Sequence, residues 1–122
     1  MSRARLGRRG EAIAAQYLQA QGYQVIACNW RKREGELDIV ALEGETLVFV
    51  EVKTRRTLTY GAAEESIDAR KQARLARLAQ RFVDEHPELR FRESRFDVVV
   101  VDMTELPVQV RLYRNAFYPP EA

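Results

Sequence analysis

The sequence predicts an α/β fold in which a mixed five-stranded β-sheet is flanked by helices, with the elements in the order αβββαββ. Two segments carry apolar residues at helical spacing, which predicts two amphipathic helices. Five others carry apolar runs or alternation bounded by turn residues, which predicts strands. A helix on each side of one sheet accommodates all seven elements. With 122 residues, 46% of them hydrophobic, the chain can bury a core as one domain spanning 1–122.

The first helix is expected over residues 8–21, because Gly22 is a residue type that commonly ends helices. Its apolar stripe consists of Ala14, Ala15 and Leu18. Glu11 lies one turn earlier on the same stripe, so its carboxylate is expected at the rim of the buried face.

Three strands are expected next, over 23–30, 37–42 and 46–54. The Glu-Gly-Glu sequence at 43–45 predicts that the second and third of them form a hairpin. The polar residues at 31–35 are expected to form the loop between the first two strands.

The second half of the chain is predicted to begin with a loop over 57–66 and a long amphipathic helix over 68–86, which Pro87 ends. The apolar arc of this helix consists of Leu75, Leu78, Ala79, Phe82 and Val83. Two strands follow, at 96–102 and 108–114, and the first of them contains four consecutive valines.

The third strand is unusual because two charges, Glu51 and Lys53, follow directly on its apolar run. Side chains alternate along a strand, so both charges point to the face that also carries Leu47 and Phe49. An ion pair on an exposed edge strand is the ordinary explanation of such charges. The strand is too apolar for a solvated edge, however, and we therefore expect a site.

The length of the hairpin loop decides whether a second carboxylate, Asp38, joins Glu51. A two-residue loop at Gly44 and Glu45 places the two acids directly opposite each other, with Cβ atoms about 5 Å apart. A three-residue loop would pair Asp38 with Val50 and put the acids on opposite faces. A four-residue loop would restore the same face with a diagonal offset.

Two like charges so placed repel each other unless a cation lies between them, and Mg²⁺ is commonly held by one or two carboxylates. We therefore expect Asp38 and Glu51 to bind Mg²⁺ or Mn²⁺, with the Val52 carbonyl as a third protein oxygen. Lys53 is expected to position or deprotonate a water, or to neutralise charge on a scissile phosphate. Glu11 is expected to support the metal shell or a second ion.

Basic residues suggest a polyanionic partner, although the net charge is only +2. Arg70, Arg74, Arg77 and Arg81 form one stripe on the second helix, and an ordinary solvated helix face is the more frequent explanation of such a stripe. We expect nucleic acid, DNA more than RNA, to contact a set of polar residues. The set comprises Arg31, Arg33, Arg55, Arg56, Arg70, Gln72, Arg74 and Arg77.

Several classes of protein are excluded by composition. The single histidine, His86, cannot build a histidine-based metal or nucleophile site, and the single cysteine, Cys28, cannot form an internal disulfide. The longest apolar runs fall far short of the ~20 residues of a membrane-spanning helix. The basic N-terminus lacks the apolar core of a secretory signal, so a cytoplasmic protein without a membrane partner is expected.

The motifs resemble those of the PD-(D/E)XK nuclease superfamily, whose pattern is a helix Glu, a strand Asp and a following Glu-x-Lys. Within it the chain is similar to the YraN-like family of small bacterial proteins. The matching stretches are GRRGE at 7–11, YLQAQGYQVIACNWR at 17–31, GELDIVA at 35–41, FVEVKTR at 49–55, Lys71-Gln72, RFDVV at 95–99 and NAF at 115–117.

The resemblance implies a restriction-endonuclease-like core, similar to that of archaeal Holliday-junction resolvases. It implies metal binding by Asp38 and Glu51, a catalytic role for Lys53 and a supporting acidic role for Glu11. It assigns no role to Glu36 or Asp97, which also lie in matching stretches.

The leading functional expectation is a Mg²⁺-dependent endonuclease acting on DNA, including branched or structured duplexes. The alternatives are a nucleic-acid-binding module of the same fold without catalysis, and an assembly protein whose charges tie strand to helix. Cutting both strands of a duplex often needs two copies, so a homodimer is considered, with the valine-rich strand or residues 113–120 as its interface.

Overall fold

The computed structural model describes residues 3–56 and 67–118, and the loop predicted at 57–66 lies outside this part of the chain. Its seven elements are α1 (Arg3–Ala20), β1 (Gln24–Lys32), β2 (Gly35–Glu43), β3 (Thr46–Arg55), α2 (Ala69–Glu85), β4 (Glu93–Asp102) and β5 (Gln109–Phe117). The predicted order αβββαββ is confirmed. The ends differ by a few residues, most at α1, which begins at Arg3 rather than at residue 8.

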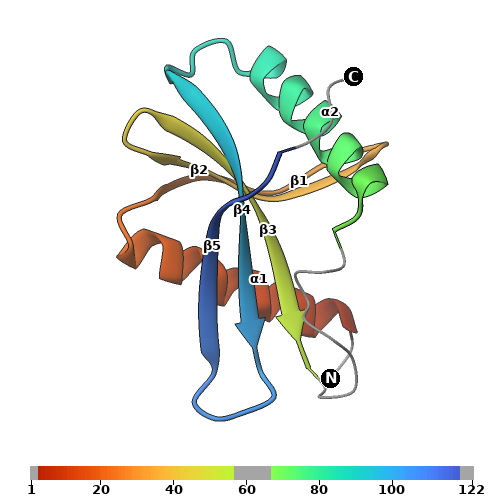
Figure 1. The fold of residues 1–122 in the computed structure, drawn as a ribbon, viewed down its shortest axis with the longest axis vertical. Coiled ribbons are helices and arrows are strands. Elements are labelled where there is room, and N and C mark those ends of the chain that lie inside the picture. Colours follow the sequence, from red (N-terminus) through yellow and green to blue (C-terminus); the bar gives the residue numbers. More distant parts are fainter. Residues whose placement is uncertain (1–2, 57–66, 119–122) are drawn as a thin grey trace.

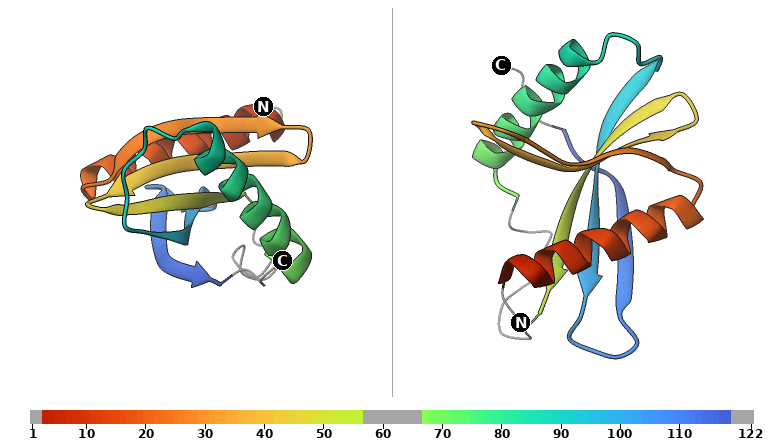
Figure 2. Two further views of the ribbon diagram at one scale, coloured as in Figure 1. Left: turned by 90° about the horizontal axis from the view of Figure 1, so that it is seen from above. Right: turned by 180° about the vertical axis from the view of Figure 1, so that it is seen from behind.

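The five strands form one mixed sheet in the order β1-β2-β3-β4-β5. Neighbouring strands are antiparallel except β3 and β4, which are parallel. A parallel pair needs a long crossover connection, and α2 lies within the connection from β3 to β4. The two helices lie on opposite faces of the sheet: Figure 1 shows α2 on one side, and the rear view in Figure 2 shows α1 crossing the other.

Both faces of the sheet are buried, which explains why β3 is apolar at every position from Leu47 to Val50. Leu47 and Phe49 pack against α2, whereas Val48 and Val50 pack against α1. The predicted stripe of α1 is buried as expected, with Ala14 and Leu18 at 0% exposure. Among the described residues, no helix combines the length and the apolar character needed to cross a membrane.

The hairpin of β2 and β3 has the register of the two-residue loop. Glu43 pairs with Thr46 and Ile39 pairs with Val50, and Gly44 adopts the positive φ of 59° that such a turn requires. Of the three loop lengths considered from the sequence, the structure therefore has the two-residue loop. The pairing ends at Ile39 and Val50, and Asp38 and Glu51 are the next residues on the two strands.

The valine-rich strand is not available as a dimer interface, and this expectation was wrong. β4 lies between β3 and β5, and its residues Val98 to Val101 are at most 1% exposed. β3 and β5 are hydrogen-bonded to its two edges. Val98 and Val100 belong to the core on one face of the sheet, and Val99 and Val101 to the core on the other. β5 is an edge strand, and the exposed Tyr118 follows it.

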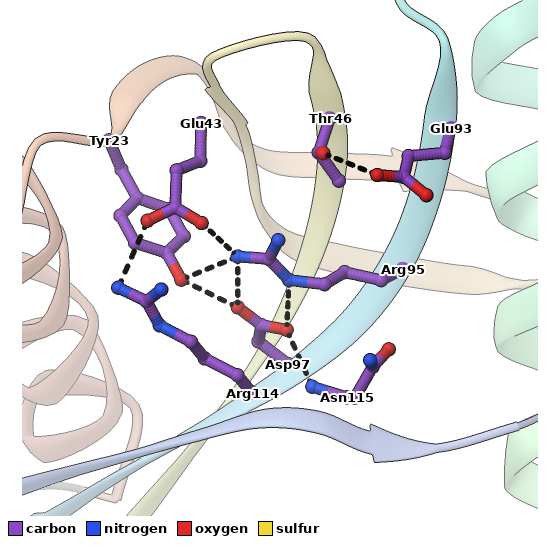
Figure 3. Close-up of polar contacts among 8 residues, drawn as sticks. All are labelled: Tyr23, Glu43, Thr46, Glu93, Arg95, Asp97, Arg114 and Asn115. Carbon is purple, nitrogen blue, oxygen red and sulfur yellow. Dashed lines mark hydrogen bonds and ion pairs between the residues drawn. The ribbon is translucent and has the colours of Figure 1, made fainter.

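A buried polar network ties the far end of the sheet together around Asp97, as Figure 3 shows. Asp97 is fully buried, and its carboxylate accepts hydrogen bonds from the Tyr23 hydroxyl at 2.8 Å and from Arg95 Nε at 2.9 Å. The backbone N–H of Asn115 donates to the same carboxylate at 3.1 Å. Asp97, which the sequence left without a role, thus joins Tyr23, the residue before β1, to β4 and β5.

The network continues outward through a second carboxylate. Arg95 also contacts Glu43, and Arg114 Nη2 lies 2.9 Å from the other Glu43 oxygen. Burial and the neighbouring Asp97 raise the pKa of Tyr23 to about 12, so its hydroxyl stays protonated and donates throughout the physiological range. All charges of the network thus have partners, as buried charges require.

We predict that Asp97→Asn lowers the free energy of unfolding by about 2–4 kcal/mol, because Arg95 loses a buried counter-charge. Glu93→Gln is the matched control. Glu93 is exposed, and its carboxylate accepts only a 3.4 Å contact from Thr46 within the described residues. Urea unfolding of the three proteins measures the difference, and equal stabilities of the two variants would show that the network does not hold the sheet end.

Candidate functional site

The first turns of α1 pass very close to β3. Gly10 has no side chain, and a Cβ placed on it would lie 2.1 Å from Thr54 Oγ1. Any larger residue would have to push the helix away from the strand or displace the hydroxyl. This close approach brings the next residue, Glu11, toward the end of the sheet where the charges of β2 and β3 lie.

Three carboxylates gather at this end of the sheet. Glu11, Glu36 and Asp38 each place one carboxylate oxygen within 4.8 Å of the other two. Asn29 joins two of them, because its Nδ2 donates to both the Glu11 and the Glu36 carboxylates. Asn29 has a φ of 52°, a left-handed conformation that asparagine tolerates better than most residues. Arg31 adds an ion pair with Glu36 at 3.1 Å.

The surroundings of Asp38 disfavour the ionised form of its carboxyl group. Burial, the charge of Glu51 and the charges of Glu11 and Glu36 raise the pKa of Asp38 to about 8, against the lowering effect of a hydrogen bond from Val52 N–H. That bond measures 2.8 Å. Burial also raises the pKa of Glu11. Repulsion among the acids therefore favours either a bound proton or a bound cation at this point.

A solvent-open cavity of about 350 Å³ adjoins the acids. Glu11, Asn29, Arg31 and Glu36 line it, together with Gly7 and Arg8 of α1. Water and an ion can therefore reach the Glu11 and Glu36 carboxylates from this cavity.

Glu51 lies beside two lysines rather than within the tight group of three acids. It is 8% exposed, and its Oε1 is 2.7 Å from Lys71 Nζ and 3.8 Å from Lys53 Nζ. Burial and the adjacent Lys71 lower the pKa of Lys53. Burial works against protonation of Lys71 too, but the hydrogen bond and charge of Glu51 outweigh it and raise the pKa of Lys71.

The donor set fits a hard divalent cation. Two oxygens on opposite sides of a Mg²⁺ ion are about 4.2 Å apart, since each lies about 2.1 Å from the metal. Neighbouring ligands of such an ion are about 3 Å apart, so the three carboxylate oxygens, which lie within 4.8 Å of one another, would draw together around it. Glu11, Glu36 and Asp38 could hold such an ion, and Glu51 could join by releasing Lys71.

The structure brings Glu11, Asp38, Glu51 and Lys53 to one end of the sheet, as the motif implies. Val52 participates through its N–H, which donates to Asp38. Gln72 is different: its Nε2 donates to the Ile67 carbonyl at 3.2 Å, and its side chain lines a separate cavity over β4 and β5.

The arginines expected to grip nucleic acid occupy several surfaces. Arg31 lies beside the acids, Arg33 in the β1–β2 turn, and Arg55 at the end of β3, where it is 3.8 Å from Asp102. The other four, Arg56, Arg70, Arg74 and Arg77, are exposed. Arg81, the last member of the helix stripe, contacts Glu34 at 2.8 Å and Glu85 at 2.9 Å, so it ties α2 to the β1–β2 turn.

Three residues of the site escaped assignment from the sequence: Lys71, Asn29 and Glu36. Lys71 stands next to Gln72 in a matching stretch, and its position in the first turn of α2 was the available signal. Asn29 and Glu36 also lie in matching stretches, but only the left-handed turn at Asn29 and the register of β1 against β2 show that they meet Glu11.

The sheet topology and the placement of a helix glutamate, a strand aspartate and a Glu-x-Lys sequence define a nuclease-like domain of the PD-(D/E)XK class. Fold and charged residues agree on this class: α1 supplies Glu11, β2 supplies Asp38, and β3 supplies Glu51 and Lys53.

Comparison with known proteins gives the family. A model of "Uncharacterised protein family UPF0102" matches residues 10–101, so the chain belongs to that family, the YraN-like family of the sequence analysis. The chain is 50% identical over 113 residues to a UPF0102 protein of Frankia casuarinae, and the matched stretch covers 92% of this chain and 95% of the relative. It is 46% identical over 101 residues to a UPF0102 protein of Pseudomonas savastanoi pv. phaseolicola, covering 83% and 82%.

We predict that Asp38→Asn stabilises the metal-free protein at pH 8. In the unfolded chain Asp38 ionises near its ordinary pKa of 3.8, whereas in the folded protein it ionises near 8. The folded state is therefore penalised increasingly as the pH rises from about 4 to about 8, and asparagine removes the charge while keeping an acceptor for Val52 N–H. We expect a gain of roughly 1 kcal/mol or more at pH 8 that vanishes near pH 4.

Thermal unfolding in EDTA at pH 4, 6 and 8 measures this effect, and titration with Mg²⁺ should stabilise the parent but not the variant. Asp84→Asn, at an exposed position of α2 that accepts a hydrogen bond from Gln80, is the matched control for the loss of an aspartate charge. A variant less stable than the parent at pH 8 would contradict the repulsion described here.

Proposed function

We propose that this protein is a metal-dependent phosphodiesterase that cleaves nucleic acid as an endonuclease, DNA more than RNA, with Mg²⁺ or Mn²⁺ as its cofactor. One observation carries the proposal: three converging carboxylates, Glu11, Glu36 and Asp38, stand at the same sheet end as a half-buried lysine, Lys53. Hydrolysis of a phosphodiester needs carboxylates that hold a divalent cation. It also needs a group that can transfer a proton, such as an amine of lowered pKa.

A bound divalent cation would supply Lewis-acid stabilisation of the phosphate and a water of lowered pKa. Glu11, Glu36 and Asp38 would hold it, with Glu51 as a further ligand. Asn29 keeps the Glu11 and Glu36 carboxylates oriented by donating to both. The Val52 N–H does the same for Asp38.

The two lysines would divide their work. Lys71, 2.7 Å from Glu51 and with a raised pKa, keeps a permanent positive charge beside the position of the phosphate. Lys53, whose pKa is lowered by burial and by Lys71, can exchange a proton at Nζ with a nearby water. A partly desolvated amine of this kind suits general acid–base chemistry near neutral pH.

Exposed arginines would bind phosphates without reading sequence. Arg31 beside the acids and Arg70, Arg74 and Arg77 on α2 are the side chains that support this part of the proposal. Such contacts weaken with salt, so binding of nucleic acid should fall steeply between low and physiological ionic strength.

We predict that Lys53→Met reduces cleavage by about 10²–10⁴-fold, the usual contribution of general acid–base catalysis, while the protein stays folded. Lys32→Met is the matched control, since Lys32 also contacts a glutamate, Glu85, at 2.9 Å. Glu85 is the last residue of α2, whereas Lys71 of the candidate site lies in the first turn of that helix. Labelled branched, nicked, linear and single-stranded DNA, and RNA, are incubated with each protein in Mg²⁺ or Mn²⁺.

Cleavage that persists unchanged in Lys53→Met would identify a contaminating nuclease and remove the support for catalysis. Salt-dependent binding without cleavage by the parent would favour the alternative, a nucleic-acid-binding module of the same fold. A parent that binds neither metal nor nucleic acid would leave the assembly protein.

A further inference from the structure

A second cavity, of about 580 Å³, lies apart from the acids, over β4 and β5 on the face of the sheet that α2 only partly covers. Val98 lies in its floor, Tyr113 and Phe117 in its wall on β5, and Gln72 on the side of α2. Pockets that bind small organic groups fall in the same range of volume. The proposed reaction assigns no task to this cavity.

A bulge in β5 hollows the sheet here. Phe96 pairs with Phe117 and Val98 pairs with Tyr113. Between these two pairings β5 therefore contains two more residues than β4 does. Asn115 takes the left-handed φ of 51° inside the bulge. Figure 3 shows its backbone N–H held by the Asp97 carboxylate, and the buried network therefore fixes one wall of the cavity.

The cavity lies in line with the candidate active site. Glu51 pairs with Val98, and Val98 pairs with Tyr113, so these three residues form one row across β3, β4 and β5. Two strand spacings separate the backbones of Glu51 and Tyr113 by about 10 Å. On the helix side, Gln72 of the cavity directly follows Lys71, which contacts Glu51. A strand whose phosphate lies at the lysines thus has the cavity within reach of a neighbouring base.

The chemistry of the lining suits a nucleobase. Tyr113 and Phe117 offer aromatic faces for stacking, and Phe117 is itself stacked on Phe96 with ring centroids 5.0 Å apart. Gln72 donates its Nε2 to Ile67, which leaves its amide oxygen as an acceptor for a base edge. Arg111, two residues before Tyr113, lies on the same face of β5, where its guanidinium is 3.6 Å from the Asp102 carboxylate.

We propose that this cavity receives one unpaired nucleobase of the strand whose phosphate lies at Lys53 and Lys71. The inference rests on the proposed function and narrows its substrate class. Bulged, flapped, branched or single-stranded nucleic acid presents an unpaired base at no cost, whereas a continuous duplex must first unstack one. The protein therefore prefers nucleic acid with an unpaired base beside the bound phosphate.

The test measures binding rather than cleavage, in EDTA or Ca²⁺, with a labelled duplex that carries one bulged 2-aminopurine and a fully paired duplex of equal length. The parent should bind the bulged duplex roughly 5- to 100-fold more tightly, the range that stacking of one base supplies, and should change the 2-aminopurine fluorescence. Tyr113→Leu and Gln72→Leu should each bring this preference, the ratio of bulged-duplex to paired-duplex affinity, near unity.

Tyr17→Leu, a tyrosine on α1 and so on the opposite face of the sheet, is the matched control that should keep the preference. Thermal unfolding confirms that each variant is folded, and Gln72→Leu serves if Tyr113→Leu is not. Equal affinity of the parent for both duplexes overturns the inference, as does micromolar binding of free deoxyadenosine monophosphate without a preference for the bulge.

The two proposals fail separately. Cleavage of bulged and paired duplexes at equal rates, with unchanged 2-aminopurine fluorescence, would remove the base cavity and leave the nuclease. A bulge preference lost in Tyr113→Leu, in a parent that cleaves nothing, would retain the cavity and remove the nuclease.

Discussion

Electrostatic repulsion among carboxylates at one end of the sheet is the constraint on which the site depends. Three different elements supply the four acids, Glu11, Glu36, Asp38 and Glu51. The charges of the other three raise the pKa of Asp38. Partial compensation comes from donors, with Asn29 and Arg31 at Glu36 and Lys71 at Glu51. Folding therefore stores unfavourable energy here that a cation would release. Helix packing, strand register and the left-handed backbone at Asn29 together hold the groups against that repulsion.

The same sheet shows the opposite solution at its other end. Asp97 is more deeply buried than Asp38, yet its neighbours are Arg95, Tyr23 and a backbone N–H. Every oxygen of Asp97 has a donor, so the group stabilises the fold and needs no ligand. Two aspartates of the same sheet, Asp38 in β2 and Asp97 in β4, thus differ in role because their neighbours differ in charge. That difference separates the structural acid from the candidate functional one more clearly than burial does.

Sequence patterns were enough to predict the elements, because both helices carry apolar stripes and the inner strands β2, β3 and β4 carry long buried apolar runs. Alternation in β3 was enough to place Glu51 and Lys53 on one face, and the hairpin register was reduced to three choices that the structure resolves. Lys71 and Asn29 were missed because their positions depend on the packing of α2 and on a positive φ, neither of which leaves a periodic signal. Gln72 and the valines of β4 show the same limit, since side-chain direction and strand order arise from the tertiary arrangement.

The turn at Gly44 and Glu45 has a consequence for how such a chain can change over evolutionary time. Surface turns usually accept insertions and deletions with little effect. Here the turn lies far along the hairpin from Asp38 and Glu51, yet adding a single residue would rotate one strand's side chains relative to the other. A change of register by one residue would thus move Asp38 and Glu51 to different faces and exchange the side chains packed on the two sides of β3, so this exposed loop is under a constraint that its own contacts do not reveal.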